Sequence, residues 1–489
     1  MYEDRILNEK LRSKVMSADE AAQFIKSGMV VASSGFATGF PRAVPAAVAK
    51  AQTAKDVTLI FPAGRGDGLL GVWARAGVTG RYYAFQINKD SRAKINDGHI
   101  KFADYHLGQV TEKIRTGYFG HIDCAICEIS KIDENGNIIP GVAGGSLDTI
   151  IEAADKVILE INLALPNNLD GLHDFHIAKG TIFDPADISK KVGLPYIKCD
   201  PDKIAAIVFN NEEAHDLSYS EPLPSHKAMA RIIVDFIKDE IKKGSLPEDF
   251  TFQCGTGLVI NSVLGELFSG GFKNLKMFTE ILSDQAMQAV LDDVISAAST
   301  TGIDLSAEGY KTMFANIDKI KEHVAVRNVE FTNGSGPISN CNLLALNGAV
   351  ECDIYGNVNS SHAFGTNIIN GIGGSNDFCR NAKVSIFSTV STTKKGAVSR
   401  IVPMVSHVDS TEHDVDVIVT EWGIADLRGL SPKERVPLMI NLAHPDYRQQ
   451  LWDYYNGALE KCGPCQTPHD LSKAFSMYER YEKTGTMKE

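Results

Sequence analysis

The sequence predicts an α/β protein built from two related domains with mainly parallel sheets. Short apolar runs alternate with longer amphipathic stretches along the chain, which is the pattern of strands joined by helices. The length of 489 residues exceeds that of one ordinary domain. A glycine-containing pattern also occurs once in each half. With 44% hydrophobic residues, the chain has enough apolar material for a large core.

The first half of the chain contains the clearest strand signals. A capping box of Ser17 and Glu20 predicts the start of a helix, and Pro41 marks the first turn of another helix from about Arg42. The stretch 163–200 is rich in Pro, Asn, Asp and His, so we expect it to be irregular. Strands are expected at 29–35, 57–64, 121–130, 156–162 and 203–210.

A polar segment at 210–224 is the expected domain boundary. It divides the chain into an N-terminal domain, 1–220, and a C-terminal domain, 221–489. The amphipathic stretch 225–243 predicts a helix that opens the second domain. Strands are expected at 251–258, 275–281, 343–354, 383–390 and 414–421, with helices to about Phe268 and through 295 and a capping box at Ser431 and Glu434.

The two halves share a local pattern that indicates an internal duplication. In each half a Gly-Asn pair is followed by Gly-Gly-Ser, then by an Asp two residues later, then by a strand. A chance resemblance of two glycine loops is the alternative. The matching positions are Gly136-Asn137, Gly144–Ser146 and Asp148 in the first half, and Gly356-Asn357, Gly373–Ser375 and Asp377 in the second.

The overall charge and the apolar content exclude several function classes. A net charge of −12 disfavours nucleic acid and anionic membranes as main partners. No apolar run approaches the roughly 18 residues that a membrane helix needs. The acidic start, MYEDRILNEK, is unlike a secretory signal, so a cytoplasmic enzyme is expected. The nine cysteines are odd in number and mostly flanked by apolar residues, which favours reduced thiols.

Glu280 is the main candidate for chemistry. It stands at the C-terminal end of the apolar run KMFTE, and ligands gather outside the carboxyl ends of strands in open α/β sheets. A carboxylate is costly to bury without a partner or a task, and a desolvated one can attack a carbonyl to form a covalent acyl intermediate. A helix cap or a salt bridge is the structural alternative. Glu421, at the end of VIVTE, is a second acid in the same setting, with an ion pair as its alternative.

Two glycine loops could bind an anion. Gly255-Thr256-Gly257 follows an expected strand and opens an expected helix, and Gly371–Ser375 reads GIGGS. Such turns expose backbone N–H groups that can hold a phosphate or stabilise an oxyanion. Neither loop matches the dinucleotide fingerprint GxGxxG, and a tight turn without a ligand remains the alternative for both.

The cysteine pairs support a second hypothesis, a nucleotide-binding α/β protein with a redox site. Cys462-Gly-Pro-Cys465 has the thioredoxin-like spelling, but it follows a helical stretch rather than a strand. Cys124 and Cys127 are three residues apart in an expected strand, so their side chains should point to opposite faces. The histidines show no ligand spacing such as HExxH, and we expect no metal site.

Taken together, these motifs resemble the acetyl-CoA hydrolase/transferase family, and within the class I CoA-transferases the succinyl-CoA:acetate type. Segments 353–378 and 402–432 and the strand end FTE at 278–280 carry the resemblance, which covers nearly the whole chain. It implies an enzyme that moves CoA between an acyl-CoA and acetate, propionate, butyrate or succinate, or else hydrolyses acyl-CoA at the same site. It also implies a homodimer with coenzyme A as substrate and no tightly bound cofactor.

The resemblance further implies roles for individual residues. The family's Arg that contacts the carboxylate substrate has no counterpart in 210–220, where His215 stands, so the preferred acid is left open. Thr256 also replaces a residue that is often Val. The implied roles are ping-pong transfer through a glutamyl-CoA thioester on Glu280, oxyanion binding by the N–H groups of Thr256 and Gly374, positioning by Asn333, a second active-site acid at Glu421, and CoA contacts from Gly255, Thr256, Gly257, Gly374 and Lys394.

Overall fold

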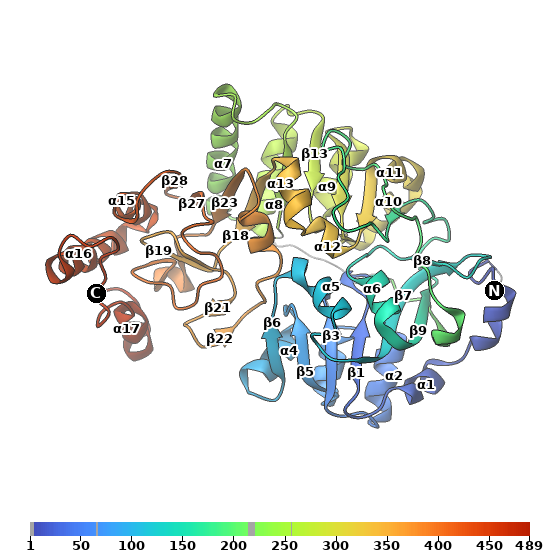
Figure 1. Ribbon diagram of the computed structural model, residues 1–489. Helices are drawn as coiled ribbons and strands as arrows, with labels where there is room; N and C mark the ends of the chain where they lie inside the picture. Colours follow the sequence, from blue (N-terminus) through green and yellow to red (C-terminus); the bar gives the residue numbers. More distant parts are fainter. Residues whose placement is uncertain (1–3, 65–66, 214–220, 256) are drawn as a thin grey trace. The chain divides into compact units, whose positions relative to one another are not determined.

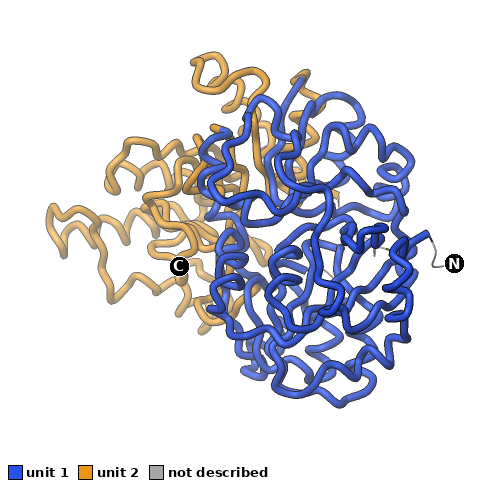
Figure 2. The backbone as a smooth tube through the Cα atoms, turned by 45° about the vertical axis from the view of Figure 1, so that its right-hand side comes forward, with its two compact units in different colours: residues 1–218, 274–341, 370–377 blue, residues 219–273, 342–369, 378–489 orange. Residues whose placement is uncertain are grey.

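The computed structural model describes residues 4–64, 67–213, 221–255 and 257–489, and the chain divides into two compact units (Figure 2). Unit 1 takes two segments from the second half of the chain, so it is not one continuous stretch. The expected division into domains at residue 220 stays a prediction. Unit 1 consists of 1–218, 274–341 and 370–377; unit 2 consists of 219–273, 342–369 and 378–489.

A parallel sheet forms the N-terminal part of unit 1, in the order β11-β9-β7-β1-β3-β5-β6. The expected apolar runs all appear as strands, and the parallel pairing confirms the predicted fold class. Three further strands of this sheet were not expected: β5, β6 and β8 (Ile138–Pro140), which pairs antiparallel with β7. The bounds are β1 Val30–Ser33, β3 Val57–Phe61, β5 Thr79–Ala84, β6 Lys101–Asp104, β7 Ile122–Ile132, β9 Ala154–Asn162 and β11 Ile204–Asn210.

Helices cover both faces of this sheet, because alternate strand residues point to opposite sides (Figure 1). Cys124 packs with the helices of one face and Cys127 with those of the other, which confirms their predicted divergence. The first face holds α1 (Ala18–Ala21), α2 (Ala43–Ala51) and α3 (Leu70–Ala76), and the second holds α5 (Leu107–Arg115) and α6 (Leu147–Ala153). The Ser17–Glu20 capping box is present.

The remainder of unit 1 contains parallel strands in the order β10-β17-β15-β13, flanked by α9, α10 and α11. The helix expected through 295 ends earlier, because Ile295 already begins a strand that pairs with neighbours on both sides. The bounds are β10 His173–Asp174, β13 Leu275–Phe278, β15 Ile295–Thr300, β17 Val324–Arg327, α9 Asp284–Leu291, α10 Ala307–Ala315 and α11 Ile317–His323.

The stretch 163–200 is largely irregular, as predicted, and a buried ion pair fixes it. Arg327 and Asp174 are both 0% exposed and lie 2.7 Å apart. The Arg327 guanidinium also donates to the carbonyl oxygen of Ile188 at 2.6 Å and to Ser299 Oγ at 2.7 Å. A charged pair buried this deeply is tolerated because the arginine donors find acceptors. The irregular stretch is therefore held against β17.

Unit 2 has its own parallel strands, in the order β12-β18-β23-β27, with β28 antiparallel to β27. The helix predicted at 225–243, the strands expected at 251–258, 383–390 and 414–421 and the capping box of Ser431 are confirmed. The strand expected at 343–354 is divided into two strands of different sheets, Leu344–Gly348 and Glu351–Asp353. The bounds are β12 Thr251–Cys254, β18 Leu344–Gly348, β23 Val384–Ser388, β27 Val417–Thr420, β28 Gly423–Asp426, α7 Pro224–Lys242, α8 Leu258–Ser269, α15 Pro432–Leu442, α16 Pro445–Cys462 and α17 Ser476–Thr484.

The two Gly-Asn pairs form the same turn. The Asn137 N–H donates to Asp133 Oδ1 at 2.8 Å, and the Asn357 N–H donates to Asp353 Oδ1 at 3.0 Å. The glycine before each Asn has a positive φ, +83° in the first turn and +96° in the second. Each turn also follows a strand that pairs with an antiparallel partner. The shared geometry supports an internal duplication rather than chance resemblance.

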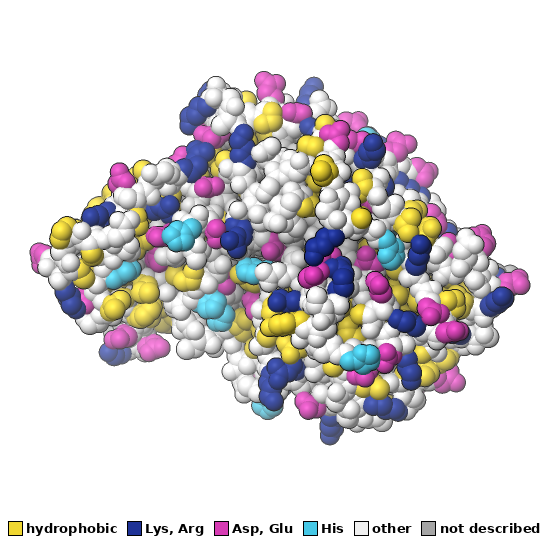
Figure 3. Space-filling model, viewed as in Figure 1, with side chains coloured by type: hydrophobic (Ala, Val, Ile, Leu, Met, Phe, Trp, Pro, Cys, Tyr) yellow, Lys and Arg dark blue, Asp and Glu magenta, His cyan; other side chains and the backbone are white. Residues whose placement is uncertain are grey.

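The surface carries charges of both signs. On the face drawn in Figure 3, Lys and Arg side chains are interspersed with Asp and Glu rather than gathered into a field of one sign. Over the described ranges, no helix is both long and apolar enough to cross a membrane.

Candidate active site

Glu280 lies just after β13, at the strand end where the sequence predicted it. Its carbonyl oxygen accepts hydrogen bonds from the N–H groups of Thr301 and Gly302, at 3.1 and 3.0 Å. Thr300 Oγ1 donates to the same oxygen at 2.8 Å. The helix that follows, α9, uses Ser283 as its N-cap residue, so Glu280 is not a helix cap. The backbone that carries this side chain is thus firmly held.

The carboxyl of Glu280 is poorly solvated. Desolvation raises its pKa to about 8, the Asn333 amide opposes the shift, and the negative charge of Asp377 adds to it. Asn333 Nδ2 donates to Glu280 Oε1, so the partner is a neutral amide rather than the cation of a salt bridge. Perturbed carboxyls of this kind are typical of functional sites. The ionised form lacks compensation by solvent, which favours its use as a nucleophile.

Gly374 brings backbone directly against this carboxyl. A methyl group on Gly374 would overlap both Oε1 of Glu280 and Nδ2 of Asn333. Glycine is therefore required here by close approach. The structure thus brings together three of the predicted site residues, all within unit 1.

The glycine loop is fastened to the N-terminal sheet. The N–H of Gly371 donates to the carbonyl oxygen of Gln86 at 2.6 Å, and the N–H of Ile372 donates to Asp104 Oδ2 at 2.7 Å. A side chain at position 371 would collide with Asp104 Oδ1, at 2.6 Å from the added carbon. Backbone donors can stabilise an oxyanion only if they are held in place before the reaction. The anchoring residues Gln86 and Asp104 supply that rigidity.

Asn333 is the C-cap residue of α12 (Val329–Thr332) and is bound on three sides. Besides Glu280, its Nδ2 donates to Asp377 Oδ2 at 3.1 Å, and its Oδ1 accepts from Thr332 Oγ1 at 3.1 Å. Asp377 Oδ2 also accepts from the Gly108 N–H at 2.9 Å. The sequence offered Asp377 only as part of the repeat. Its contact with Asn333 joins positions 44 residues apart, which no local pattern could reveal.

The second glycine loop belongs to unit 2. Gly255 follows β12, and its N–H donates to the carbonyl oxygen of Leu346 at 2.9 Å. Gly257 has a φ of +136° and is the N-cap residue of α8, so the loop opens a helix as expected. Thr256 lies outside the described residues, as does His215. The helix start supplies backbone N–H groups suited to an anion.

Glu421 and Lys394 also lie in unit 2. Both oxygens of Glu421 accept from Ser391, from its N–H at 2.8 Å and from its Oγ at 2.6 Å, so the predicted alternative of an ion pair is replaced by neutral donors. Lys394 Nζ bonds the hydroxyl of Tyr481 and lies 5.0 Å from the ring centre of Phe364. A cation over aromatic rings is partly compensated without a carboxylate partner.

The cysteine motif lacks the setting that a redox site requires. Cys462 is the last residue of α16, and Gly463 is its C-cap residue. Cys465 lies in the loop beyond. A thioredoxin-like pair instead follows a strand and opens a helix. The geometry therefore disfavours the redox hypothesis.

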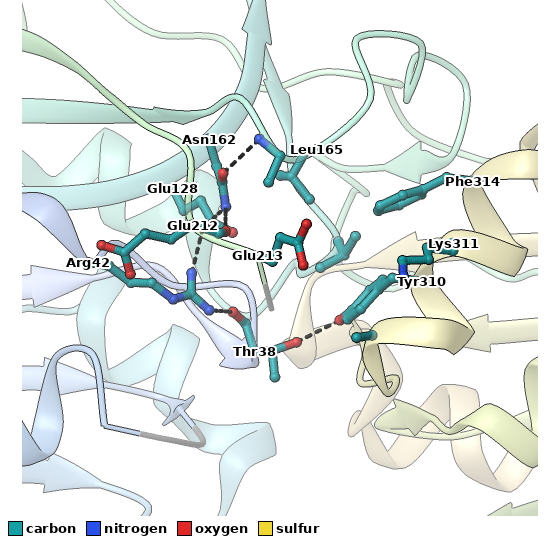
Figure 4. A pocket seen from close by; sticks show the side chains of 13 residues that line it. Thr38, Arg42, Glu128, Asn162, Leu165, Glu212, Glu213, Tyr310, Lys311 and Phe314 are labelled. Atoms are coloured by element: carbon teal, nitrogen blue, oxygen red, sulfur yellow. Dashed lines mark hydrogen bonds and ion pairs between the residues drawn. The ribbon is translucent and has the colours of Figure 1, made fainter. Parts of the chain in front are cut away.

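A cavity in unit 1 is lined in part by a buried ion pair (Figure 4). Arg42 and Glu128 lie 2.9 Å apart, and each side chain is 3% exposed. Burial raises the pKa of Glu128 to about 7, even though Arg42 opposes the shift. Arg42 also donates to the carbonyl oxygens of Thr38 and Phe40, each at 2.8 Å. The pair thus supports the loop between β1 and α2.

Comparison with known proteins identifies the family. The model of the acetyl-CoA hydrolase/transferase N-terminal domain matches residues 2–209, and that of the C-terminal domain matches residues 309–455. The chain is 42% identical to the succinyl-CoA:acetate CoA-transferase of Clostridium kluyveri, over 99% of this chain and 92% of that protein. This chain belongs to the acetyl-CoA hydrolase/transferase family.

Other members of the acetyl-CoA hydrolase/transferase family align over the full chain. The acetyl-CoA hydrolase of Yarrowia lipolytica is 35% identical, over 100% of this chain and 99% of that protein. Among solved structures, RipA from Yersinia pestis superimposes with a TM-score of 0.73 at 22% identity, over 92% of this chain and 98% of that one. That likeness agrees with the fold.

Proposed function

We propose that this chain transfers CoA between an acyl-CoA and a short-chain carboxylate, with Glu280 as the covalent carrier. The observation that carries the proposal is the enclosure of the Glu280 carboxyl against Gly374 and Asn333, at a strand end. The 42% identity to a protein named succinyl-CoA:acetate CoA-transferase supports the same activity.

The proposed reaction is a sequence of acyl transfers at Glu280. Its carboxylate attacks the thioester carbonyl of acyl-CoA. The bond between the acyl carbon and sulfur breaks, the CoA thiolate departs, and an acyl-glutamyl anhydride is formed. The thiolate then attacks the Glu280 carbonyl carbon, which releases the first acid and forms a glutamyl-CoA thioester. A second carboxylate attacks that thioester, and the same steps in reverse yield the new acyl-CoA and free Glu280.

The glycine loops supply the charge stabilisation in this proposal. The N–H groups of Gly374 and Thr256 bind the tetrahedral oxyanion, and the loss of one such donor typically costs about 3 kcal/mol. Gly255 and Gly257 run along CoA, and Lys394 contacts it as a cation. Glu421 acts as the second acid of the site. Exclusion of water protects the thioester until the acceptor acid arrives.

Trapping of the covalent intermediate tests the proposal. Incubation with acetyl-CoA and measurement of intact protein mass should reveal one CoA attached to the wild-type chain. Glu280→Gln, which keeps the size and the hydrogen-bonding oxygen but removes the nucleophile, should carry none. Glu308→Gln serves as the matched control, because the Glu308 side chain is 83% exposed on α10. A CoA adduct on Glu280→Gln would contradict the assignment.

Hydrolysis of acyl-CoA at the same site is the second candidate function. The relative from Yarrowia lipolytica, named an acetyl-CoA hydrolase, favours it. The two activities differ in the fate of the thioester, which either an acid or water can attack. Release of free CoA thiol without an acceptor acid measures hydrolysis. A screen of acetate, propionate, butyrate and succinate measures transfer and identifies the acid that the chain prefers.

The proposal extends to the state of the protein in the cell. We place the chain in the cytoplasm as a homodimer, with CoA and carboxylates as its partners and no tightly bound cofactor. Light scattering on the purified chain tests the dimer, since one chain has a mass of 53.1 kDa.

A further inference from the structure

The short helix α12 is held at both ends by the repeated Asp of the duplication. Before its first residue, Asn328 Nδ2 donates to Asp148 Oδ1. After its last residue, Asn333 Nδ2 donates to Asp377 Oδ2 at 3.1 Å. Asp148 and Asp377 occupy equivalent positions in the two halves of the sequence, two residues after Gly-Gly-Ser. Of these two contacts, the one at Asp377 includes the amide that binds Glu280.

The orientation of the Asn333 amide is fixed by chemistry. Its Nδ2 faces two carboxyl groups, those of Glu280 and Asp377, and each offers a carboxyl oxygen that accepts an N–H hydrogen bond. Its Oδ1 faces the hydroxyl of Thr332, which donates to it. Both N–H bonds of the amide are therefore used, one on each carboxylate. Asn333 is a bridge between the two acids.

We propose that Asp377 is a positioning residue for the Glu280 reaction, because it holds the Asn333 amide in place while Glu280 changes its charge. This inference rests on the proposed function. Glu280 passes through anhydride and thioester states in which its oxygen is neutral and accepts a weaker hydrogen bond. The bond to Asp377 is unaffected by that change, so the amide stays beside the reacting carbonyl throughout the cycle.

Asp377 also acts on Glu280 through its charge. Two carboxylates that share one amide nitrogen repel each other, and this repulsion makes the ionised nucleophile less stable. Formation of a neutral acyl-glutamyl group relieves the repulsion. Asp377 thus favours the covalent intermediate over the free carboxylate, in addition to holding Asn333.

Two of the other titratable groups on the neighbouring elements, Asp104 and Glu330, have partners of their own. Asp104, at the end of β6, accepts from the Ile372 N–H. Glu330, on α12, pairs with Arg115 at 2.6 Å. His106 is the N-cap residue of α5, and its buried Nδ1 has no hydrogen-bond partner among the described residues. These groups remain the same in a variant of Asp377, so a change in the pH profile reports on Asp377 itself.

Two variants separate the hydrogen bond from the charge. Asp377→Asn can keep an acceptor oxygen toward Asn333 and Gly108 but removes the negative charge. Asp377→Ala removes both. Asp148→Asn is the matched control, because it changes the equivalent Asp at the other end of α12 and leaves the Asn333 amide, which binds Glu280, unchanged. The measurement is the single-turnover rate of CoA attachment from acetyl-CoA, followed by intact mass across a range of pH.

For Asp377→Asn, we expect the rate of CoA attachment to begin its rise at lower pH than in the wild type, because Glu280 ionises more readily without the neighbouring negative charge. For Asp377→Ala, we expect the plateau to fall about 10- to 100-fold, the size of one lost charge-assisted hydrogen bond. Asp148→Asn should leave the pH range of this rise unchanged even if its melting temperature falls. The inference would be overturned if the rate of CoA attachment rose over the same pH range and reached the same plateau in both Asp377 variants as in the wild type.

A second measurement keeps the inference separate from the proposed function. The effect of Glu280→Gln on the melting temperature depends on the ionisation of Glu280 and needs no catalysis. If Asp377 repels Glu280, the alkaline stabilisation by Glu280→Gln should shrink in the Asp377→Asn background. An unchanged effect refutes the coupling even in an active enzyme. Absence of a CoA adduct from the wild type, with the coupling present, refutes the proposed function alone.

Discussion

Replacement of Glu280 by Gln should stabilise the protein at alkaline pH while it abolishes CoA attachment. The carboxyl lies where desolvation raises its pKa to about 8, from an ordinary value of 4.5. The folded state therefore binds the proton more tightly than the unfolded state does. Stability falls as pH rises from about 4.5 to about 8, because unfolding releases an ionised carboxylate into water. Glutamine has the same shape and carries no charge to solvate.

The size of the effect follows from the shift in pKa. A difference between 4.5 and about 8 corresponds to roughly 5 kcal/mol at about 1.4 kcal/mol per pKa unit. Residual solvent at a partly exposed residue reduces this figure, so we expect a gain of about 2 to 5 kcal/mol above pH 8. Below about pH 4 the carboxyl is mostly protonated in both states, and the variant should match the wild type.

Calorimetric melting of the wild type, Glu280→Gln and the exposed control Glu308→Gln at about pH 4 and about pH 9 measures this difference. The transition of Glu280→Gln should move up by several degrees at the higher pH alone. Enzymes often keep destabilising groups of this kind at sites of reaction. An equal shift at both pH values would refute the reasoning, since it would mean that ionisation of Glu280 is not the source of the instability.

Four further predictions follow from the same geometry. Arg327→Met leaves the buried Asp174 without its cationic partner, so it should lower the unfolding free energy by about 3 to 5 kcal/mol in a denaturant titration. The methyl group added by Gly374→Ala overlaps the Glu280 carboxyl, so kcat should fall by about 100-fold or more. Turnover at the wild-type rate would contradict this prediction. The wild-type rate of CoA attachment should rise with pH to a plateau above about 8, because the ionised Glu280 reacts; a flat profile would argue against it. Cys462→Ser should keep full activity in a steady-state assay, since Cys462 merely ends α16.

Much of the fold could be predicted because buried parallel strands are apolar runs that stand out in the sequence. Several strands that escaped prediction have a different composition, although β17, VAVR, is an apolar run like the predicted ones. The strand β5, TGRYYA, and the edge strand β6, KFAD, mix polar and charged residues with apolar ones, so neither forms an apolar run. The strand β15, ISAAST, consists largely of small residues that fit a helix equally well. Its identity is decided by pairing with β13 and β17, which a local pattern does not contain.

The candidate site could be predicted only in part, for a related reason. Glu280 was found from its place at a strand end, and Gly374 from a glycine loop, since both signals are local. Asp377, Gln86 and Asp104 act through contacts between distant segments. Gln86 acts through its carbonyl oxygen, so its side chain gives no signal at all. The repeat pointed to Asp377, but the partner of that residue became visible only in three dimensions.

Unit 1 contains segments from both halves of the chain. The first half can therefore influence the reaction proposed for Glu280, which belongs to the second half. Glu280, Asn333 and the glycine loop come from residues beyond 270, yet all lie in the unit that contains the N-terminal sheet. Asp104 holds the loop through the Ile372 N–H, and the Gly108 N–H holds Asp377. The first half therefore fixes groups that surround the proposed nucleophile. If rigid placement of these groups is what makes Glu280 effective, then changes at Asp104 should lower turnover even though Asp104 makes no bond to Glu280 itself.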